Sequence, residues 1–385
     1  MNSTALAPSP ADLLCGSRRT SLVTAALELP TTAAVSVRVD RVQRRRDGVS
    51  VGYDVSYRAQ GADVRDYLVA STAPLALAAS GTARLSQDGV EVALWRHPAD
   101  PALPGLAAAC DLASVTTWLP TVRDLRIVTY RPLRRAVVQA RLMGGASAYL
   151  KVVRPHVAAG LRQRHELLGH LGAPRVIAEP TPGLLVLSEV VGPTLGAALA
   201  TAGAVPSLAA IEALLDAIPA EARELEPTMP WTHTVADQGR LVEMTPALRT
   251  RFDSLTREVE TAVRSTGQNL PLVATHGDLH AGNLILGAGG GIGGLLDVDR
   301  LGPGHRVDDL ACLIGHTSLA GALDPTPAGA EAAARALAWW REASHPDALA
   351  PRIAALMLSL IPVLPATSVP AVLDQAEAWM TQPSH

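Results

Sequence analysis

The stretch His276–Asp299, HGDLHAGNLILGAGGGIGGLLDVD, decides the fold because it joins three oxygen-bearing side chains to two short apolar runs. Asp278 and Asn283 lie five residues apart, and the first apolar run, Leu284–Leu286, follows directly. A glycine-rich tip then leads into a second apolar run that ends on Asp297. Two strands joined by a tight turn lie antiparallel, so we expect Asp297 to return beside Asn283. An amide oxygen and a carboxylate, completed by phosphate oxygens and water, are ligands that Mg2+ prefers.

The only lysine of the chain is a second informative feature. The sequence holds 33 Lys+Arg residues, of which Lys151 is the single lysine, within the alternating apolar run Ala148–Val153. Such alternation is typical of a β-strand. A lysine ammonium is a compact charge that suits phosphate oxygens, and the planar fork of arginine does not substitute for it. The pattern indicates a phosphate-binding lysine, with a surface lysine in an arginine-biased chain as the alternative.

The bulk composition excludes several classes of protein. The 385 residues are 48% hydrophobic but only 3% aromatic, and the formal net charge is -3, so we expect no nucleic-acid partner. The three cysteines, Cys15, Cys110 and Cys312, are far apart and show neither a disulfide framework nor a zinc spacing, which favours the reducing cytoplasm. The apolar stretch Ile353–Ala366 is short and broken by prolines, whereas a membrane span needs about 20 apolar residues. We therefore expect no membrane partner.

The order of the predicted elements divides the chain into three parts. Residues 1–120 predict a helix followed by β-rich segments, an N-terminal accessory unit in which we find no chemistry. Residues 121–192 predict three strands, a helix and two strands, with Lys151 on the third strand. Residues 193–385 predict helices, interrupted by the hairpin after Asn283. The middle part therefore has the element order of a kinase small lobe.

At these residues the chain resembles the aminoglycoside phosphotransferase family, protein-kinase-like enzymes that also include choline, homoserine and other small-molecule kinases. The matching motifs are His276–Asn283, Leu296–Asp299 and Asp308–Ala311, in that order. The resemblance covers roughly residues 125–345 and leaves the N-terminal unit outside. It implies an α+β fold, bilobal and protein-kinase-like, with a β-rich small lobe, a mainly helical large lobe and an extra N-terminal α/β unit.

The resemblance also implies a cytoplasmic, ATP-dependent kinase that transfers a γ-phosphate to a hydroxyl of a small molecule. Asp278 would be the catalytic base, Asn283 and Asp297 would hold Mg2+, and Lys151 would bind the α- and β-phosphates. ATP is the expected co-substrate, with GTP possible. The acceptor stays open among aminoglycosides, sugars and amino alcohols, and no oligomeric state is predicted.

Further residues are candidates for binding the nucleotide. Glu166 is the implied ion-pair partner of Lys151, and a local pair with Arg162 is the equal alternative. Glu189 and Val190 lie in a segment that resembles the hinge, where backbone groups would meet adenine. The chain departs from the kinase pattern at the phosphate-covering loop, which is arginine-rich and not glycine-rich. Arg131 in this loop would contact phosphate by charge, with plain surface charge as the alternative.

Supporting roles are expected for polar residues around the base. His276 and His280 flank Asp278, as metal ligands or as hydrogen-bonding groups of the loop, and for His276 we favour the second role. Asp299 is expected on the same side of the strand as Asp297, as an auxiliary metal group or a solvated acid. Asp309 is expected to bond to the catalytic loop.

Two other functions are open. A two-metal phosphoesterase uses Gly-Asp and Gly-Asn motifs too, but with wide separation and a histidine after the asparagine, whereas here Leu284 follows Asn283. A catalytically silent, kinase-like nucleotide-binding module would have no need of all four residues Asp278, Asn283, Asp297 and Lys151. We therefore favour the enzyme.

Overall fold

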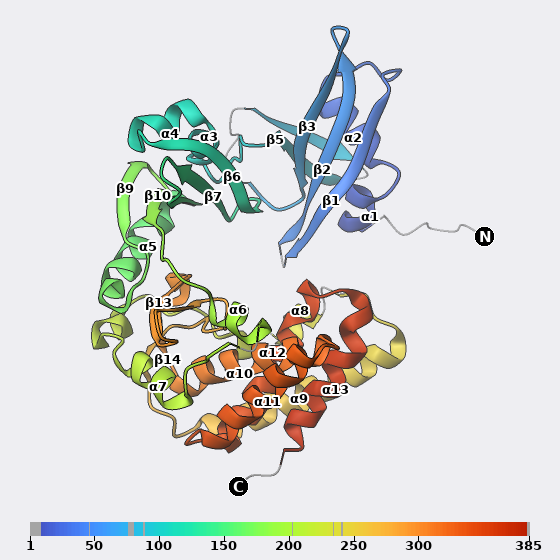
Figure 1. Cartoon of the computed structure of the whole chain (residues 1–385). Helices are drawn as coiled ribbons and strands as arrows, with labels where there is room; N and C mark the ends of the chain where they lie inside the picture. The colour runs from blue at the N-terminus through green and yellow to red at the C-terminus, as the bar shows by residue number, and fades with distance from the viewer. Residues whose placement is uncertain are drawn as a thin grey trace, which may run out of the picture. The chain divides into compact units, whose positions relative to one another are not determined.

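The computed structural model describes residues 9–45, 47–75, 81–87, 89–201, 203–233, 235–239 and 242–382. It divides the chain into two compact units, described separately below (Figure 1). The first unit comprises Met1–Ala159 and Val176–Glu189. The second comprises Gly160–Arg175 and Val190–His385.

The first unit begins with a five-stranded antiparallel sheet covered by two short helices. The strands, in the order β1-β2-β3-β5-β4, are β1 Val35–Arg45, β2 Gly48–Ala59, β3 Ala62–Ser71, β4 Thr82–Gln87 and β5 Val90–Arg96. The helices α1 (Pro10–Cys15) and α2 (Arg19–Ala26) lie against one face (Figure 1). Leu14 and Val23 of these helices are fully buried in one cluster with Tyr53 of β2. The predicted helix and β-rich segments are thus present, and β4 is an additional strand.

The second sheet of this unit carries Lys151. Its strands, in the order β6-β7-β8-β10-β9, are β6 Val122–Arg131, β7 Arg135–Leu142, β8 Ser147–Val153, β9 Val176–Thr181 and β10 Leu184–Ser188. Helices α3 (Leu106–Cys110) and α4 (Leu112–Trp118) precede it, and α5 (Pro155–Leu167) follows β8. The predicted order of three strands, a helix and two strands is confirmed.

One hydrophobic core joins the two sheets. Val69 and Trp95 of the first sheet are buried in the same cluster as Val138 and Leu150 of the second. Because residues of both sheets bury their apolar side chains in this one cluster, the two sheets pack as one unit. The division into domains 1–120, 121–192 and 193–385 stays a prediction.

The second unit is mainly helical. Its helices are α6 Leu195–Ala200, α7 Leu208–Asp216, α8 Val235–Gly239, α9 Pro246–Gly267, α10 Arg306–Leu323, α11 Pro327–Glu342, α12 Pro346–Leu360 and α13 Val369–Met380. Its strands are β11 Val273–Thr275, β12 Leu284–Leu286, β13 Ile292–Leu295 and β14 Gly302–Gly304. Thr245 and Thr326 cap α9 and α11 with their side-chain oxygens, and proline follows each cap, which fixes where these helices begin. The α+β, kinase-like fold class predicted from the sequence is confirmed.

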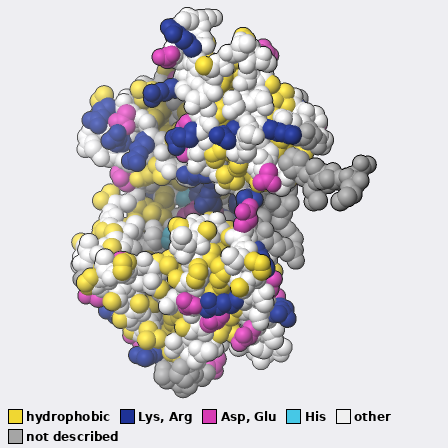
Figure 2. Space-filling view, turned by 90° about the vertical axis from the view of Figure 1, so that its right-hand side faces the viewer, with side chains coloured by type: hydrophobic (Ala, Val, Ile, Leu, Met, Phe, Trp, Pro, Cys, Tyr) yellow, Lys and Arg dark blue, Asp and Glu magenta, His cyan; other side chains and the backbone are white. Residues whose placement is uncertain are grey.

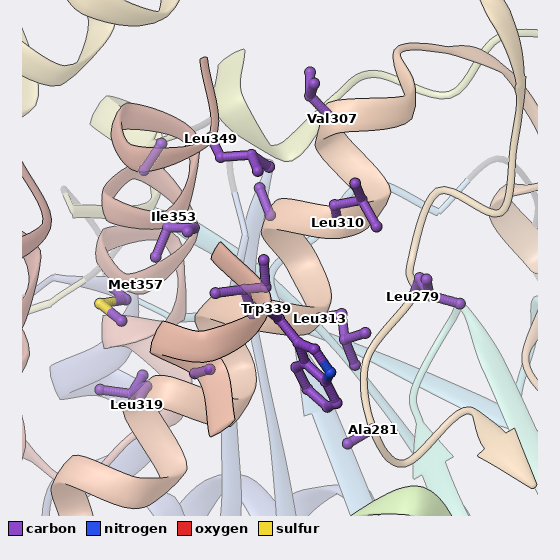
Figure 3. Packing of buried hydrophobic residues seen from close by; sticks show 14 of the residues in the cluster. Leu279, Ala281, Val307, Leu310, Leu313, Leu319, Trp339, Leu349, Ile353 and Met357 are labelled. Carbon is purple, nitrogen blue, oxygen red and sulfur yellow. The ribbon is translucent and has the colours of Figure 1, made fainter. Parts of the chain in front are cut away.

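The helical core lies directly beneath the loop that carries Asp278. Figure 3 shows Trp339 of α11 reaching past Leu313 of α10 toward Ala281, with Leu279 nearby. Trp339, Leu313 and Leu279 are each fully buried. The loop is fixed to this core because Leu279 and Ala281, which flank His280 in the sequence, are both buried in it.

Helix α12 is apolar enough to resemble a membrane span. The segment Pro346–Val363 has a mean hydropathy of 1.3, and 67% of it is buried inside the protein. Arg352 in its middle is 3% exposed and donates from Nε to Asp308 over 2.9 Å. Its hydropathy therefore reflects a central core helix with one paired charge.

The surface of the helical unit carries charges of both signs. Figure 2 shows acidic and basic side chains next to one another on the face drawn there. Arg251 of α9 pairs with Asp374 and Glu377 of α13, with nitrogen–oxygen distances of 2.6 and 2.7 Å. These pairs tie two helices together that are far apart in the sequence.

Candidate active site

The hairpin predicted between Asn283 and Asp297 is present in the helical unit. Leu284 pairs with Leu295 across β12 and β13. Beyond the last pair, the backbone nitrogen of Leu296 donates to the Asn283 oxygen over 2.8 Å. Asn283 therefore lies opposite Leu296, one residue from Asp297. The sequence prediction that the hairpin returns Asp297 beside Asn283 agrees with this pairing.

Asp297 follows the second strand, two residues after its end at Leu295, in an unusual backbone conformation. Its φ of 49° and ψ of 56° place it in the left-handed region, and a 3-10 turn, Val298–Arg300, follows. Aspartate is one of the few non-glycine residues that adopt this region readily. The expectation that Asp299 projects to the same side as Asp297 is wrong in its premise, because the two-residue period of a strand stops at Asp297.

The loop before the hairpin positions Asp278 and Asn283. Asn283 is 6% exposed, and its Nδ2 donates to the backbone oxygen of Asp278 over 2.9 Å. The backbone nitrogen of Asn283 donates to the His280 oxygen over 2.8 Å, which closes the turn. Since the Asn283 amide nitrogen is engaged by the loop itself, its Oδ1 is left as a ligand oxygen.

A single buried carboxylate holds the start of this loop. Asp309 is 1% exposed and accepts hydrogen bonds of 2.8 Å from the backbone nitrogens of His276 and Gly277. Burial raises the pKa of Asp309, and these two N–H donors act in the opposite direction. His276 is fully buried, and its Nε2 lies 2.9 Å from the Leu296 oxygen. The expected structural roles of Asp309 and His276 are confirmed.

His280 links the loop to a histidine that the sequence did not single out. The backbone nitrogen of Gly282 donates to His280 Nδ1 over 3.0 Å, so His280 hydrogen-bonds its own loop. Burial lowers the pKa of His280, while the charges of Asp278 and Asp297 act to raise it. Both carboxylates thus lie near this ring. The ring of His316, on α10, lies 5.0 Å from that of His280 between centroids.

In the first unit, Lys151 is buried in the middle of the second sheet. It is 5% exposed and stands on β8 between Val137 of β7 and Leu185 of β10. An amine with almost no exposure on a central strand requires polar partners. This burial argues against the alternative of a plain surface lysine.

The predicted hinge begins where β10 ends, at Ser188. The Glu189 side chain accepts a hydrogen bond from the Ser147 backbone nitrogen over 2.8 Å, which fixes it to the start of β8. Val190 is half-buried, and Val191 is 84% exposed. The chain leaves the sheet here, and the binding of adenine by Glu189 and Val190 stays a prediction.

The arginine-rich turn between β6 and β7 is held by a buried aspartate. Asp100 is 4% exposed and accepts from the Tyr130 hydroxyl over 2.7 Å and from the Leu133 nitrogen over 2.9 Å. Trp95 Nε1 donates to the same hydroxyl over 3.1 Å. Leu133 is buried with φ at 63°, so the turn next to Arg131 has a fixed, left-handed residue where kinases place glycine. Nothing in the sequence had pointed to Asp100.

Glu166 makes the local ion pair that was the alternative from the sequence. It belongs to the second unit, its side chain is 60% exposed, and it lies 3.2 Å from Arg162 Nη1. The buried residues of this part of the helix are Arg164 and His165, which directly precede Glu166 in the sequence. Arg164 is 9% exposed and donates to the Leu301 oxygen over 3.0 Å, and His165 is 2% exposed. A role of Glu166 as partner of Lys151 stays a prediction.

The comparisons with known proteins agree with this architecture. A β-rich unit with a buried lysine and a helical unit with an Asp–Asn–Asp loop and hairpin define a kinase-like protein. The profile of the phosphotransferase enzyme family matches residues 54–352, more than half of the 385 residues. The chain belongs to this family.

The chain is also similar to several solved structures, at low identity. Aminoglycoside phosphotransferase APH(3'')-Id from Streptomyces rimosus is 20% identical, covering 65% of this chain and 98% of its own, with a TM-score of 0.43. Macrolide 2'-phosphotransferase MphH from Brachybacterium faecium is 21% identical, covering 73% and 99%, with a TM-score of 0.39. Choline kinase LicA from Streptococcus pneumoniae is 15% identical, covering 71% and 92%, with a TM-score of 0.43. No curated protein sequence matches the chain.

Proposed function

We propose that the chain transfers the γ-phosphate of ATP to a hydroxyl of a small molecule of the aminoglycoside, sugar or amino-alcohol type. The observation that carries this proposal is the joint placement of three oxygen-bearing residues in one unit. The amide of Asn283 is bonded to the backbone of Asp278, and the backbone of Asn283 is bonded to Leu296, the residue before Asp297. Family membership supports the reaction class.

Asp278 acts as the base in this proposal. Its carboxylate accepts the proton of the acceptor hydroxyl while the hydroxyl oxygen forms a bond to the γ-phosphorus. The bond from the γ-phosphorus to the bridging oxygen breaks, and ADP leaves with that electron pair. Because the transition state of phosphoryl transfer is loose, positioning and charge supply most of the rate.

Mg2+ is the metal that fits the residues present. The part of the chain that the structure describes has no cluster of three His, Cys, Asp or Glu side chains suited to a metal. Asn283 and Asp297 supply two hard oxygen ligands, and Mg2+ is usually bound by one or two carboxylates together with phosphate and water. When bound, the ion would neutralise charge on the phosphates.

The nucleotide would be held mainly by residues of the first unit, together with Val190, the first residue of a segment of the second. The buried Lys151 supplies a point charge for the α- and β-phosphates, and Arg131 adds charge at the neighbouring turn. The backbone of Glu189 and Val190 would meet the purine. The same contacts are open to GTP.

The test is a mass-spectrometric screen of hydroxylated metabolites and antibiotics with Mg-ATP and, separately, Mg-GTP. We expect a gain of one phosphate on at least one acceptor. Asp278→Ala should lower turnover by about 10²- to 10⁴-fold with nucleotide affinity largely kept. Asp253→Ala, an exposed acid on α9, is the matched control and should leave turnover unchanged.

Three outcomes would contradict the proposal in part or in whole. Normal turnover in Asp278→Ala removes the base assignment. Nucleotide binding without transfer to any acceptor favours the silent module, and hydrolysis that needs two metals but no nucleotide favours the phosphoesterase.

A further inference from the structure

A cavity of about 250 Å³ lies beside the catalytic loop, entirely within the helical unit. Its walls come from α6, from the loop residues after Leu279, and from α10 and the start of α11. The volume is just below the range of about 300–1,000 Å³ typical of drug-sized ligands. It suits one ring of a small hydroxylated molecule.

The wall of this cavity is built mainly from small apolar residues. Alanine and glycine from α6, the loop, α10 and α11 form most of it. Asp324 is the one charged side chain among the lining residues, all of which the structure describes. Its Oδ1 already accepts from the Thr326 nitrogen over 3.0 Å. A polycation placed here would lose water without gaining matching carboxylates, which is unfavourable.

A few polar groups converge on this apolar wall. Because His280 Nδ1 accepts from Gly282, the proton of the neutral ring sits on Nε2, which is a donor. Within the described residues, the ring nitrogens of His316 make no hydrogen bond. Thr317 is 3% exposed, and its Oγ1 has no hydrogen-bond partner in the described part of the chain. The ring nitrogens of His280 and His316 are therefore the groups of the wall that can bond to a ligand hydroxyl.

The charge state of His316 agrees with an uncharged ligand. Burial, and to a smaller extent the neighbouring His280, together lower the pKa of His316 to about 4. His316 is therefore neutral at physiological pH and both donates and accepts hydrogen bonds, as a sugar hydroxyl does.

The cavity borders the reacting groups. His280 is two residues from Asp278 in the same loop, and its backbone nitrogen donates to the backbone oxygen of Asp278 over 3.1 Å. A ligand bonded to His280 Nε2 thus lies close to the base. Resting on the phosphotransferase function proposed above, we propose that this cavity receives the acceptor and selects an uncharged hydroxylated molecule, such as a neutral sugar ring, over a polycation.

Substitutions on α6 test the cavity with little risk to the fold. Ala200 is exposed at its rim, so Ala200→Trp fills the opening from outside. Ala197 is exposed on the same helix and does not line the cavity, so Ala197→Trp is the matched control. Ala200→Glu adds a carboxylate to the rim.

Binding is measured first on the full chain without nucleotide, by saturation-transfer NMR. The probes are uncharged mono- and disaccharides with their methyl glycosides, and kanamycin and streptomycin as polycations. We expect binding of at least one neutral probe, weakened at least tenfold by Ala200→Trp and unchanged by Ala197→Trp. Ala200→Glu should shift the preference toward the polycations at least threefold.

The outcomes separate this proposal from the proposed function. It is overturned if no neutral probe binds, if polycations bind more tightly at a site that Ala200→Trp blocks, or if both tryptophan variants behave alike. Binding of a neutral probe without phosphate transfer from Mg-ATP would contradict the proposed function and leave the selectivity of the cavity standing. Where transfer is seen, Ala200→Trp should raise the acceptor KM and leave the ATP KM unchanged.

Discussion

The catalytic loop of the helical unit and the arginine-rich turn of the first unit are held by the same device. Each is tied to one buried aspartate that accepts backbone N–H groups, Asp309 for the loop and Asp100 for the turn. The two segments differ in whether a sequence motif identifies the aspartate that holds them. Asp309 follows the loop as part of a recognisable motif, whereas Asp100 lies outside any motif and reaches its turn through Tyr130. Two aspartates with the same structural role are thus marked by a sequence motif in one case and by no motif in the other.

The largest effect is expected from removing the anchor of the catalytic loop. Asp309→Ala leaves two buried backbone N–H groups without partners, at about 1–3 kcal/mol each, so we expect a loss of about 2–6 kcal/mol of stability. Transfer should fall with it, because Asp278 loses its position. Urea unfolding of the helical unit and turnover measure the two effects. Glu258→Ala on the surface of α9 is the control, and equal stability of both variants would contradict the anchor.

The lysine of the first unit is expected to matter next. Lys151→Arg keeps the charge but enlarges a buried side chain and replaces a point charge by a fork. We expect the ATP KM to rise about tenfold, equivalent to about 1.4 kcal/mol, with a smaller effect on kcat. Steady-state kinetics measure both. The exposed Arg141→Lys on β7 is the control, and unchanged kinetics in Lys151→Arg would remove this lysine from the nucleotide site.

The anchor of the arginine-rich turn should show a smaller effect, because Asp100→Asn keeps an oxygen acceptor for the donors at Ala102, Tyr130 and Leu133, whereas Asp309→Ala removes both acceptors. Asp100→Asn presents an amide to these donors, and we expect about 1–3 kcal/mol less stability in the first unit. The ATP KM should rise about threefold while the acceptor KM stays constant. Hydrogen exchange at residues 131–135 would show the loosened turn. The surface variant Asp124→Asn is the control. Equal rates of hydrogen exchange at residues 131–135 in both variants would contradict the role of Asp100 as the anchor of this turn.

The smallest effect is a pH dependence of stability that arises at His316, beside the catalytic loop. Since the pKa of His316 is lowered to about 4 from an ordinary value of 6.5, the unfolded chain binds a proton here that the folded chain refuses. Stability therefore falls as pH falls from about 6.5 toward 4, by about 1–2 kcal/mol between pH 7 and pH 5. The groups facing His316 are His280 and, lining the same cavity, Asp324.

His316→Gln should remove this part of the pH dependence. Urea midpoints of both proteins between pH 7 and pH 5 provide the measurement. Parallel curves would mean that another group carries the slope.

Local patterns predicted the parts of the site that are close in sequence. The spacing of Asp278 and Asn283, the hairpin to Asp297 and the strand around Lys151 each follow from a few neighbouring residues. The succession of three strands, a helix and two strands along this part of the chain was predictable for the same reason, since each strand has its own alternation.

The missed features depend on contacts between distant segments. Strand β4, TARLSQ, has few apolar residues and is a strand because it pairs with β5. Asp100 and His316 look like ordinary residues until folding brings Leu133 and His280 to them. At Glu166, the family resemblance offered Lys151 and helical spacing offered Arg162, and the structure contains the pair with Arg162, four residues away.

The backbone of Asp297 has a consequence for how this protein changes over evolutionary time. Asparagine accepts the left-handed conformation as easily as aspartate does, so Asp297→Asn would delete a negative charge and leave the course of the chain untouched. A homologue that lost phosphotransferase activity through this substitution would keep the same backbone fold as its active ancestor. In this family, a shared fold therefore does not by itself demonstrate activity, and the activity of each member has to be measured.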